Sequence, residues 1–139
     1  WQGTGQYFLV ENRQQTGYDQ GLPGNGVLIW HIDESAANNA DEGTSPPGNK
    51  RIVVLEQADG RYDLECYANP PYPSQCNSGD STDPWKTGTA TSFTDVSTPN
   101  SKFYDAPWSG VTVTNMGASG ATMSALLATK RRRGQVTSQ

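Results

Sequence analysis

The sequence predicts an all-β protein with an antiparallel β-sandwich-like fold, of which a jelly roll is one form, and with long irregular loops. Three observations lead to this prediction. Only 33% of the 139 residues are hydrophobic, while Gly (15) and Pro (9) are plentiful, as in proteins whose short strands are joined by many turns. The apolar runs are short. Residues 26–34 (GVLIWHIDE) place four apolar residues directly before polar ones, just after the turn-forming sequence PGN.

Residues 26–34 are expected to form the central strand of the fold. Their Val, Ile and Trp content favours an extended conformation, and apolar residues on both faces indicate a strand that is covered on both sides. Residues 7–10 (YFLV) show the same pattern and are expected to form a neighbouring first strand. Residues 51–57 (RIVVLEQ) are the next expected strand, and the Asp59-Gly60 turn ends it.

A closing hairpin is expected near the end of the chain. Residues 110–116 and 121–127 alternate apolar with polar residues around the turn at residues 117–120, which is typical of half-buried strands. Within residues 87–100, Phe93 is the one large apolar anchor that we expect. We therefore expect one β-rich domain over residues 1–128, followed by a basic polar tail over residues 129–139.

Charge and hydropathy exclude some classes of partner. The formal net charge is −4 and the sequence pI is near 4.8, so there is no electrostatic reason to expect nucleic acid as a partner. No apolar run approaches the roughly 20 residues of a transmembrane helix. Acidic side chains in loops suit cations instead.

Two cysteines, Cys66 and Cys76, flank a loop that is rich in Pro and Tyr. An even number of cysteines around one short irregular loop indicates a disulfide in an exported protein, whereas in a reducing compartment they would be separate thiols. A structural zinc site is disfavoured, because it needs four ligands and the chain has two Cys and one His.

Several sequence blocks occur in the order and spacing of a known family. They are YFLVENRQQTGYDQGLPGNGVLIWHIDE, VVLEQADGRYDLE, GDSTDPW and TPNSKFYDAPWSGVTVTNMGASGATM. Together they resemble the β-rich part of the immune inhibitor A-like secreted metallopeptidases, the M6 family, that follows the zinc-binding helix. The resemblance covers roughly residues 6–125. It implies a secreted, extracellular protein with a zinc endopeptidase region, bound calcium and β-rich segments after the catalytic helix.

The chain departs from this family at the catalytic motif. Enzymes of this kind hold Zn²⁺ with the two His of HExxH, one helical turn apart. This sequence has one His and no HExxH, so we assign no catalytic residue and do not expect this chain alone to cleave peptides. Zinc is expected only in a catalytic segment outside these 139 residues.

Calcium is the cofactor that the residues and the resemblance favour. Crowded carboxylates repel one another, and a hard cation with six to eight oxygen ligands relieves that repulsion. The GDSTDP block resembles the Asp-rich block that is associated with calcium in the family. The alternative is an ordinary solvated turn in which Asp80 and Asp83 cap backbone amides. The expected ligands are Asp59, Asp63, Glu65, Asp80 and Asp83.

His31 and Asp33 share one face of the expected central strand. One interpretation makes His31 a core histidine, hydrogen-bonded to a neighbouring strand or to Asp33. The other makes both residues supports for an active site on the catalytic segment. A serine hydrolase is not indicated, because GxSxG is absent, and a glycosidase using Glu34 and Glu56 has no supporting motif.

Two functions therefore stay open. In the first, the chain is the β-rich portion of an M6-type metallopeptidase, it supports a peptidase region elsewhere, and its partner is the remainder of that peptidase chain. In the second, it is a non-catalytic extracellular module for structure, assembly or adhesion that acts by self-association.

Overall fold

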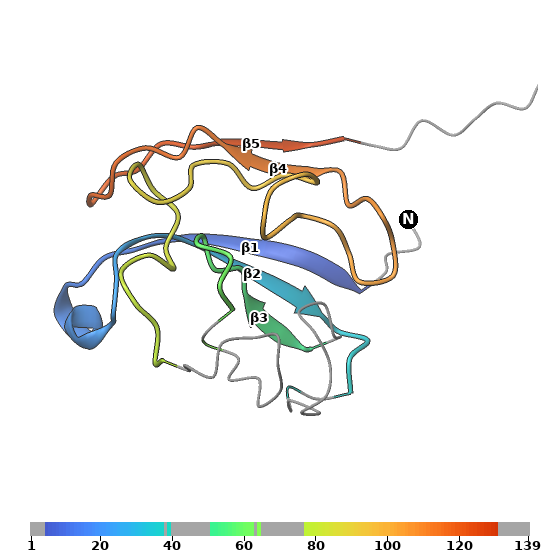
Figure 1. Cartoon of the computed structure of the whole chain (residues 1–139), viewed down its shortest axis with the longest axis horizontal. Coiled ribbons are helices and arrows are strands. Elements are labelled where there is room, and N and C mark those ends of the chain that lie inside the picture. Colours follow the sequence, from blue (N-terminus) through green and yellow to red (C-terminus); the bar gives the residue numbers. More distant parts are fainter. Residues whose placement is uncertain (1–4, 38, 40–50, 63, 65–76, 131–139) are drawn as a thin grey trace, which may run out of the picture.

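The computed structural model describes residues 5–37, 39, 51–62, 64 and 77–130 (Figure 1). The described part contains strands and one short 3-10 helix, and its sheets are antiparallel, so the all-β antiparallel prediction is confirmed. The elements are β1 (Gln6–Arg13), η1 (Gly17–Gly21), β2 (Gly26–Asp33), β3 (Val53–Leu55), β4 (Val111–Thr114) and β5 (Leu126–Thr129). Among the described residues they form two sheets, of three and two strands.

The first sheet has the order β1-β2-β3, which confirms β2 as a central strand and β1 as its neighbour. Leu9 of β1 lies opposite Trp30 of β2, and Trp30 lies opposite Leu55 of β3. β3 is shorter than the expected strand at residues 51–57, because the chain leaves the sheet after the amide of Glu56 has bonded to the oxygen of Ile29 at 2.9 Å.

The second sheet is the predicted closing hairpin, in which β4 pairs with β5. The position of its second strand was predicted wrongly: β5 begins at Leu126 and not at residue 121. Asn115 has a left-handed backbone (φ 55) that ends β4, and the amide of Gly117 then bonds to the oxygen of Ser124 at 3.0 Å. The residues between them form a loop rather than a paired strand.

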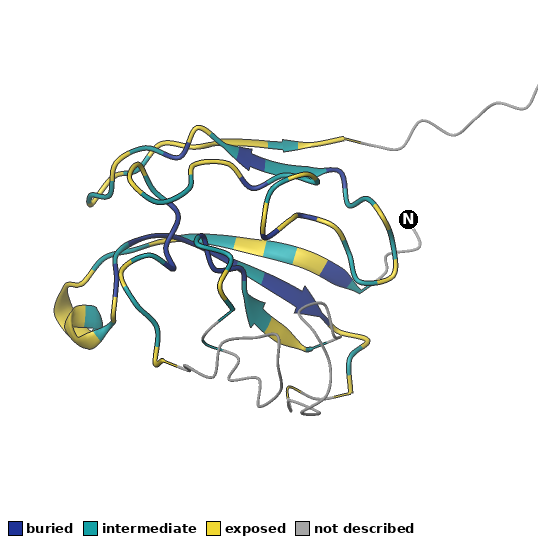
Figure 2. Cartoon of the chain, in the orientation of Figure 1, coloured by how far each residue is buried: buried dark blue, intermediate teal, exposed yellow. Residues whose placement is uncertain are grey.

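The hydrophobic core lies between the two sheets. Figure 2 shows β2 as the most deeply buried strand. Trp85 and Phe93 are fully buried, and their rings meet edge to face with centroids 5.4 Å apart, so Phe93 is the core anchor that the sequence predicted. Burying one large apolar side chain stabilises the fold by about 1.5–3 kcal/mol. The buried cluster comprises Val27, Ile29, Ala58, Trp85, Phe93, Val113 and Met116.

The segment before β4 covers the start of the first sheet. Phe103 stacks on Phe8 of β1 with centroids 5.9 Å apart, and Tyr104 stacks on His31 of β2 at 4.3 Å. These rings close the end of the core near the start of β1 and the end of β2.

Candidate metal centre

Three of the predicted ligands, Asp59, Asp80 and Asp83, come together in the structure. One carboxylate oxygen from each lies within 4.8 Å of the corresponding oxygens of the other two. Asp83 is buried, with 3% of its surface exposed, while Asp59 and Asp80 are half-buried. Two turns from separate parts of the chain therefore bring three carboxylates to one point.

The first turn follows β3 and carries Asp59. The amide of Gly60 bonds to the oxygen of Gln57 at 3.0 Å, and the amide of Arg61 bonds to Asp59 Oδ1 at 3.0 Å. Gly60 has a positive φ of 68°, a conformation that glycine adopts without steric cost. The turn that was predicted at Asp59-Gly60 is therefore present, and its hydrogen bonds orient the Asp59 carboxylate.

The second turn carries Asp80 and Asp83, which bond to its backbone. The amide of Asp80 donates to Asp83 Oδ2 at 2.6 Å, and the amide of Thr82 donates to Asp80 Oδ1 at 2.6 Å. Gly79 precedes them with φ of 92°, and a Cβ there would lie 2.8 Å from Pro23 and 3.2 Å from Asp83 Oδ2. Asp80 and Asp83 therefore cap backbone amides, as the alternative interpretation of an ordinary turn expected, and they do so within the acidic cluster.

Main-chain and indole hydrogen bonds hold the second turn against the sheet. The amide of Ala58 donates to the oxygen of Asp83 at 2.8 Å. Two residues on, Trp85 forms a two-way bridge with Val27 of β2, and its indole Nε1 donates to the oxygen of Glu56 at 2.7 Å. The acidic cluster is thus anchored to the core.

Thr82 connects the carboxylates and is a site residue that the sequence reasoning missed. Its Oγ1 lies 2.9 Å from Asp59 Oδ2 and 2.5 Å from Asp80 Oδ1, and its single proton serves one of them at a time. The hydrogen bond from the Thr82 hydroxyl to Asp80, together with the bond from the Thr82 amide, lowers the pKa of Asp80. Its position between the two Asp of GDSTDP was the available signal.

The donor chemistry of the cluster fits a hard cation. Three carboxylates and a hydroxyl supply only oxygen, which Ca²⁺ and Mg²⁺ prefer and Zn²⁺ sites rarely use alone. The guanidinium of Arg61 offsets part of the negative charge, since its Nε lies 3.7 Å from Asp59 Oδ2, but the Arg61 side chain is 67% exposed. Such an exposed partner compensates little of the charge.

Two predicted ligands, Asp63 and Glu65, lie outside the described residues, as do Cys66 and Cys76 of the predicted disulfide. These assignments stay predictions.

His31 is a buried core histidine with polar partners on both neighbouring segments. Its Nδ1 lies 3.2 Å from Glu56 Oε1, just after β3, and its Nε2 lies 3.1 Å from Gln6 Oε1 on β1. Only 1% of its surface is exposed, and its ring contacts the rings of both Tyr104 and Phe8. The sequence left a neighbouring strand and Asp33 open as partners of His31; the structure shows the first, with Gln6 on β1, and adds Glu56 just after β3.

Asp33 shares the face of His31 but bonds elsewhere. Its Oδ1 accepts hydrogen bonds from the amide of Ser35 at 2.8 Å and from the Ser35 hydroxyl at 2.5 Å. Its Oδ2 is buried and has no hydrogen-bond partner in the described part of the chain. Asp33 therefore acts on the turn that follows β2.

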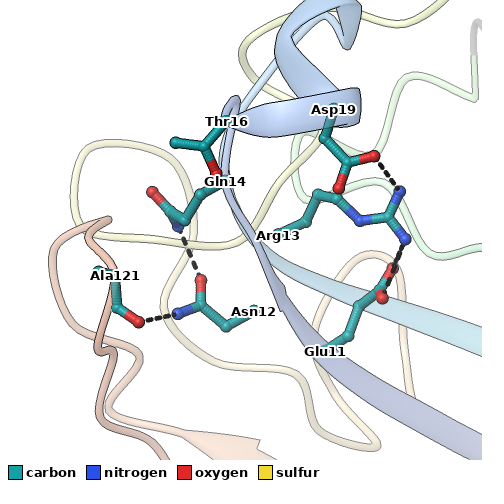
Figure 3. A pocket seen from close by; sticks show the side chains of 7 residues that line it. All are labelled: Glu11, Asn12, Arg13, Gln14, Thr16, Asp19 and Ala121. Carbon is teal, nitrogen blue, oxygen red and sulfur yellow. Dashed lines mark hydrogen bonds and ion pairs between the residues drawn. The ribbon is translucent and has the colours of Figure 1, made fainter.

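A polar pocket of about 510 Å³ lies at the end of β1 (Figure 3). Arg13 contacts both Glu11, at 2.9 Å, and Asp19, at 3.5 Å. Asn12 accepts a hydrogen bond from Gln14 at 2.7 Å. These charged groups already pair with one another.

Comparisons of the chain with protein families, with curated proteins and with solved structures found no match. In the part that the structure describes, no helix has both the length and the apolar composition needed to span a membrane. The assignment of function therefore depends on the sequence blocks and on the site geometry.

Proposed function

We propose that this chain is the β-rich, calcium-stabilised portion of a secreted M6-type zinc metallopeptidase. In this role it is not catalytic alone, and it supports a peptidase region elsewhere in a longer protein. The proposed disulfide between Cys66 and Cys76 links the two acidic segments of the sequence. The sequence blocks support the proposed family, and the acidic cluster supports the proposed calcium site.

The convergence of Asp59, Asp80 and Asp83 is the observation that carries the calcium assignment. Their oxygens lie within 4.8 Å of one another although they come from two separate turns. Ca²⁺ bound by these carboxylates would join the turn after β3 to the turn before Trp85. Because both turns are anchored to the core, bound Ca²⁺ would stabilise the folded state of the protein.

The surroundings of His31 support a non-catalytic role for this chain. A zinc-binding imidazole must offer a ring nitrogen to the metal. Both ring nitrogens of His31 already lie near polar side chains inside the core, at 3.1 and 3.2 Å. It is also the single His of the sequence.

Calcium titration of the full 139-residue chain tests the site. We expect binding by calorimetry in the range of extracellular modules, with a Kd of about 10⁻⁴–10⁻³ M. At about 100 times Kd, calcium should raise the free energy of unfolding by about 2.7 kcal/mol. Asp83→Asn should abolish most of this increase, because the substitution removes the buried charge but keeps the side-chain shape.

Asp95→Asn is the matched control, since Asp95 lies outside the cluster. It should leave the calcium-dependent increase intact. In chelator, Asp83→Asn should unfold cooperatively like the wild type, which separates loss of binding from loss of folding. No calcium-dependent stabilisation of the wild type, or an equal increase in Asp83→Asn, would contradict the calcium assignment.

The peptidase assignment has its own test. The gene that encodes this chain should also encode HExxH upstream of Trp1. A gene without that motif would remove the peptidase role and leave the calcium result standing.

A second candidate function is a non-catalytic extracellular module for assembly or adhesion. The outer face of the first sheet favours it, since Tyr7 and Leu9 of β1 and Val53 of β3 are 40%, 52% and 37% exposed. A regular assembly of many copies of the purified chain, larger than a dimer, would favour this function over the peptidase support.

A further inference from the structure

The backbone of β2 shows which edge of β1 has no strand partner among the described residues. Alternate residues of a strand direct their N–H and C=O groups to opposite edges. Val27, Ile29 and Asp33 of β2 bond to Trp85, Glu56 and Ile52, which all lie on the side away from β1. The even-numbered residues of β2 must therefore face β1.

The register of the sheet transfers this assignment to β1. Trp30 lies opposite Leu9, and Leu28 lies opposite Glu11, so the odd-numbered residues of β1 bond to β2. Phe8, Val10 and Asn12 then direct their main-chain groups to the other edge. In the described part of the chain, no strand or isolated bridge pairs with that edge.

The side chains beside this edge are incompletely covered. Phe8 and Val10 face the core but stay half-exposed, whereas Val27 and Ile29 on the adjacent strand are 4% and 0% exposed. A slot of about 250 Å³ opens between β1 and the second sheet, lined by Phe8, Val10, Val113 and Leu127 among others. Leu127 faces this slot and is 59% exposed.

The residues of β1 itself include none of the devices that usually prevent pairing. Natural proteins protect long edge strands with Pro, Lys, bulges or inward-pointing charges. β1 has eight residues paired without a break, contains neither Pro nor Lys, and points Phe8 and Val10 inward. Its two charged residues, Glu11 and Arg13, bond to each other on the outer face.

We propose that the free edge of β1 is a self-association surface, at which a second copy of this chain adds its own β1 in antiparallel orientation. The two three-stranded sheets then become one continuous sheet with twofold symmetry. This inference goes beyond the proposed function and depends on neither calcium nor a peptidase region.

A second copy suits this edge because β1 is self-complementary. Centred on Val10, the pairing sets Val10 opposite its own copy and Phe8 opposite Asn12, and each such pair can exchange two main-chain hydrogen bonds. It sets Leu9 opposite Glu11 and Tyr7 opposite Arg13, so no like charges meet. A pairing centred on Glu11 would oppose two carboxylates, which is destabilising. Symmetric pairing also closes the assembly at two copies.

Amide exchange combined with sedimentation tests the proposal on the full chain. Sedimentation should show a monomer at low concentration and a dimer at high concentration. In the dimer, the amides of Phe8, Val10 and Asn12 should exchange at least ~10-fold more slowly than in the monomer. The amides of Leu9 and Glu11 should be protected in both states, because they already bond to β2.

Two substitutions at Val10 separate the amide from the side chain. Val10→Pro removes an N–H that points away from β2, so the sheet keeps its ladder, and the dimer Kd should rise at least ~10-fold. Val10→Ala keeps the N–H and should dimerise with a Kd within about threefold of the wild type. Circular dichroism checks that both variants fold. If either does not, amide exchange in the wild-type protein still tests the proposal.

A monomer at every concentration would overturn the proposal. A dimer in which Phe8, Val10 and Asn12 exchange as fast as in the monomer would also overturn it, because the copies would then meet at another surface.

Discussion

The indole Nε1 of Trp85 lies 2.7 Å from the main-chain oxygen of Glu56. Glu56 directly follows β3, and Trp85 directly follows the turn that carries Asp80 and Asp83. This hydrogen bond and the bond from the amide of Ala58 to the oxygen of Asp83 join the two acidic turns. The same tryptophan therefore fills the core and fixes the candidate metal centre.

Replacing Trp85 with Phe should destabilise the protein by about 2–4 kcal/mol, because it leaves a cavity and a buried carbonyl without its donor. Guanidinium denaturation measures the change. Trp108→Phe is the control, since Trp108 is only half-buried, and it should cost less than about 1 kcal/mol. Equal costs for the two variants would show that the bond to Glu56 contributes little.

Replacing His31 with Phe should cost about 2–4 kcal/mol. The ring stays aromatic, but Glu56 and Gln6 lose a buried polar partner. Trp30→Phe, on the other face of β2, removes only a half-exposed hydrogen bond to Glu11 and should cost less than about 1 kcal/mol. Urea denaturation of both variants tests this, and a His31→Phe protein as stable as wild type would contradict it.

Replacing Thr82 with Val should raise the pKa of Asp80 toward its ordinary range, because the hydroxyl bond is the largest cause of the lowered pKa. A lowered pKa in the folded state adds stability at neutral pH that is lost as pH falls through it. The stability gap between wild type and Thr82→Val should therefore shrink below about pH 4.

Carboxyl NMR titration in calcium-free buffer measures the pKa of Asp80 directly. Thr82→Ser keeps a hydroxyl and should keep the lowered pKa. An unchanged pKa in Thr82→Val would assign the shift to the backbone amide of Thr82 instead.

Replacing Gly110 with Ala should destabilise the protein more than replacing Gly17 with Ala. Both glycines have positive φ, 79° and 59°, so each substitution costs about 1–2 kcal/mol in backbone strain. At Gly110 a Cβ would also collide with the oxygen of Lys130 beside β5, whereas nothing lies within 4 Å of such an atom at Gly17. Thermal unfolding compares them, and equal midpoints would contradict the collision.

Local sequence patterns predicted much of the sheet. The continuous apolar runs identified β1 and β2, and alternation around Gly117 to Gly120 identified the closing hairpin. The acidic residues and the family resemblance predicted a calcium site with five ligands, of which Asp59, Asp80 and Asp83 come together in the described part of the chain. The strand predictions depend on composition or spacing within a short stretch.

The remaining features depend on contacts between distant segments. The bridge from Trp85 to Val27 and the partners Gln6 and Glu56 of His31 come from segments that no local pattern relates. The start of β5 was predicted wrongly for a different reason. The left-handed backbone of Asn115 ends the pairing of β4, but the alternation of apolar and polar residues continues through the loop that follows.

The bridge between Val27 and Trp85 also has a consequence for refolding kinetics. β2 pairs with β1 and β3, which lie nearby in the sequence, but the Val27 end of its second edge pairs with Trp85, much later in the chain. Closing long loops slows the crossing of the folding barrier, and proteins dominated by such pairings refold in milliseconds to seconds. The hairpin of β4 and β5 should thus form early, while β2 acquires its full set of neighbours in the rate-limiting step.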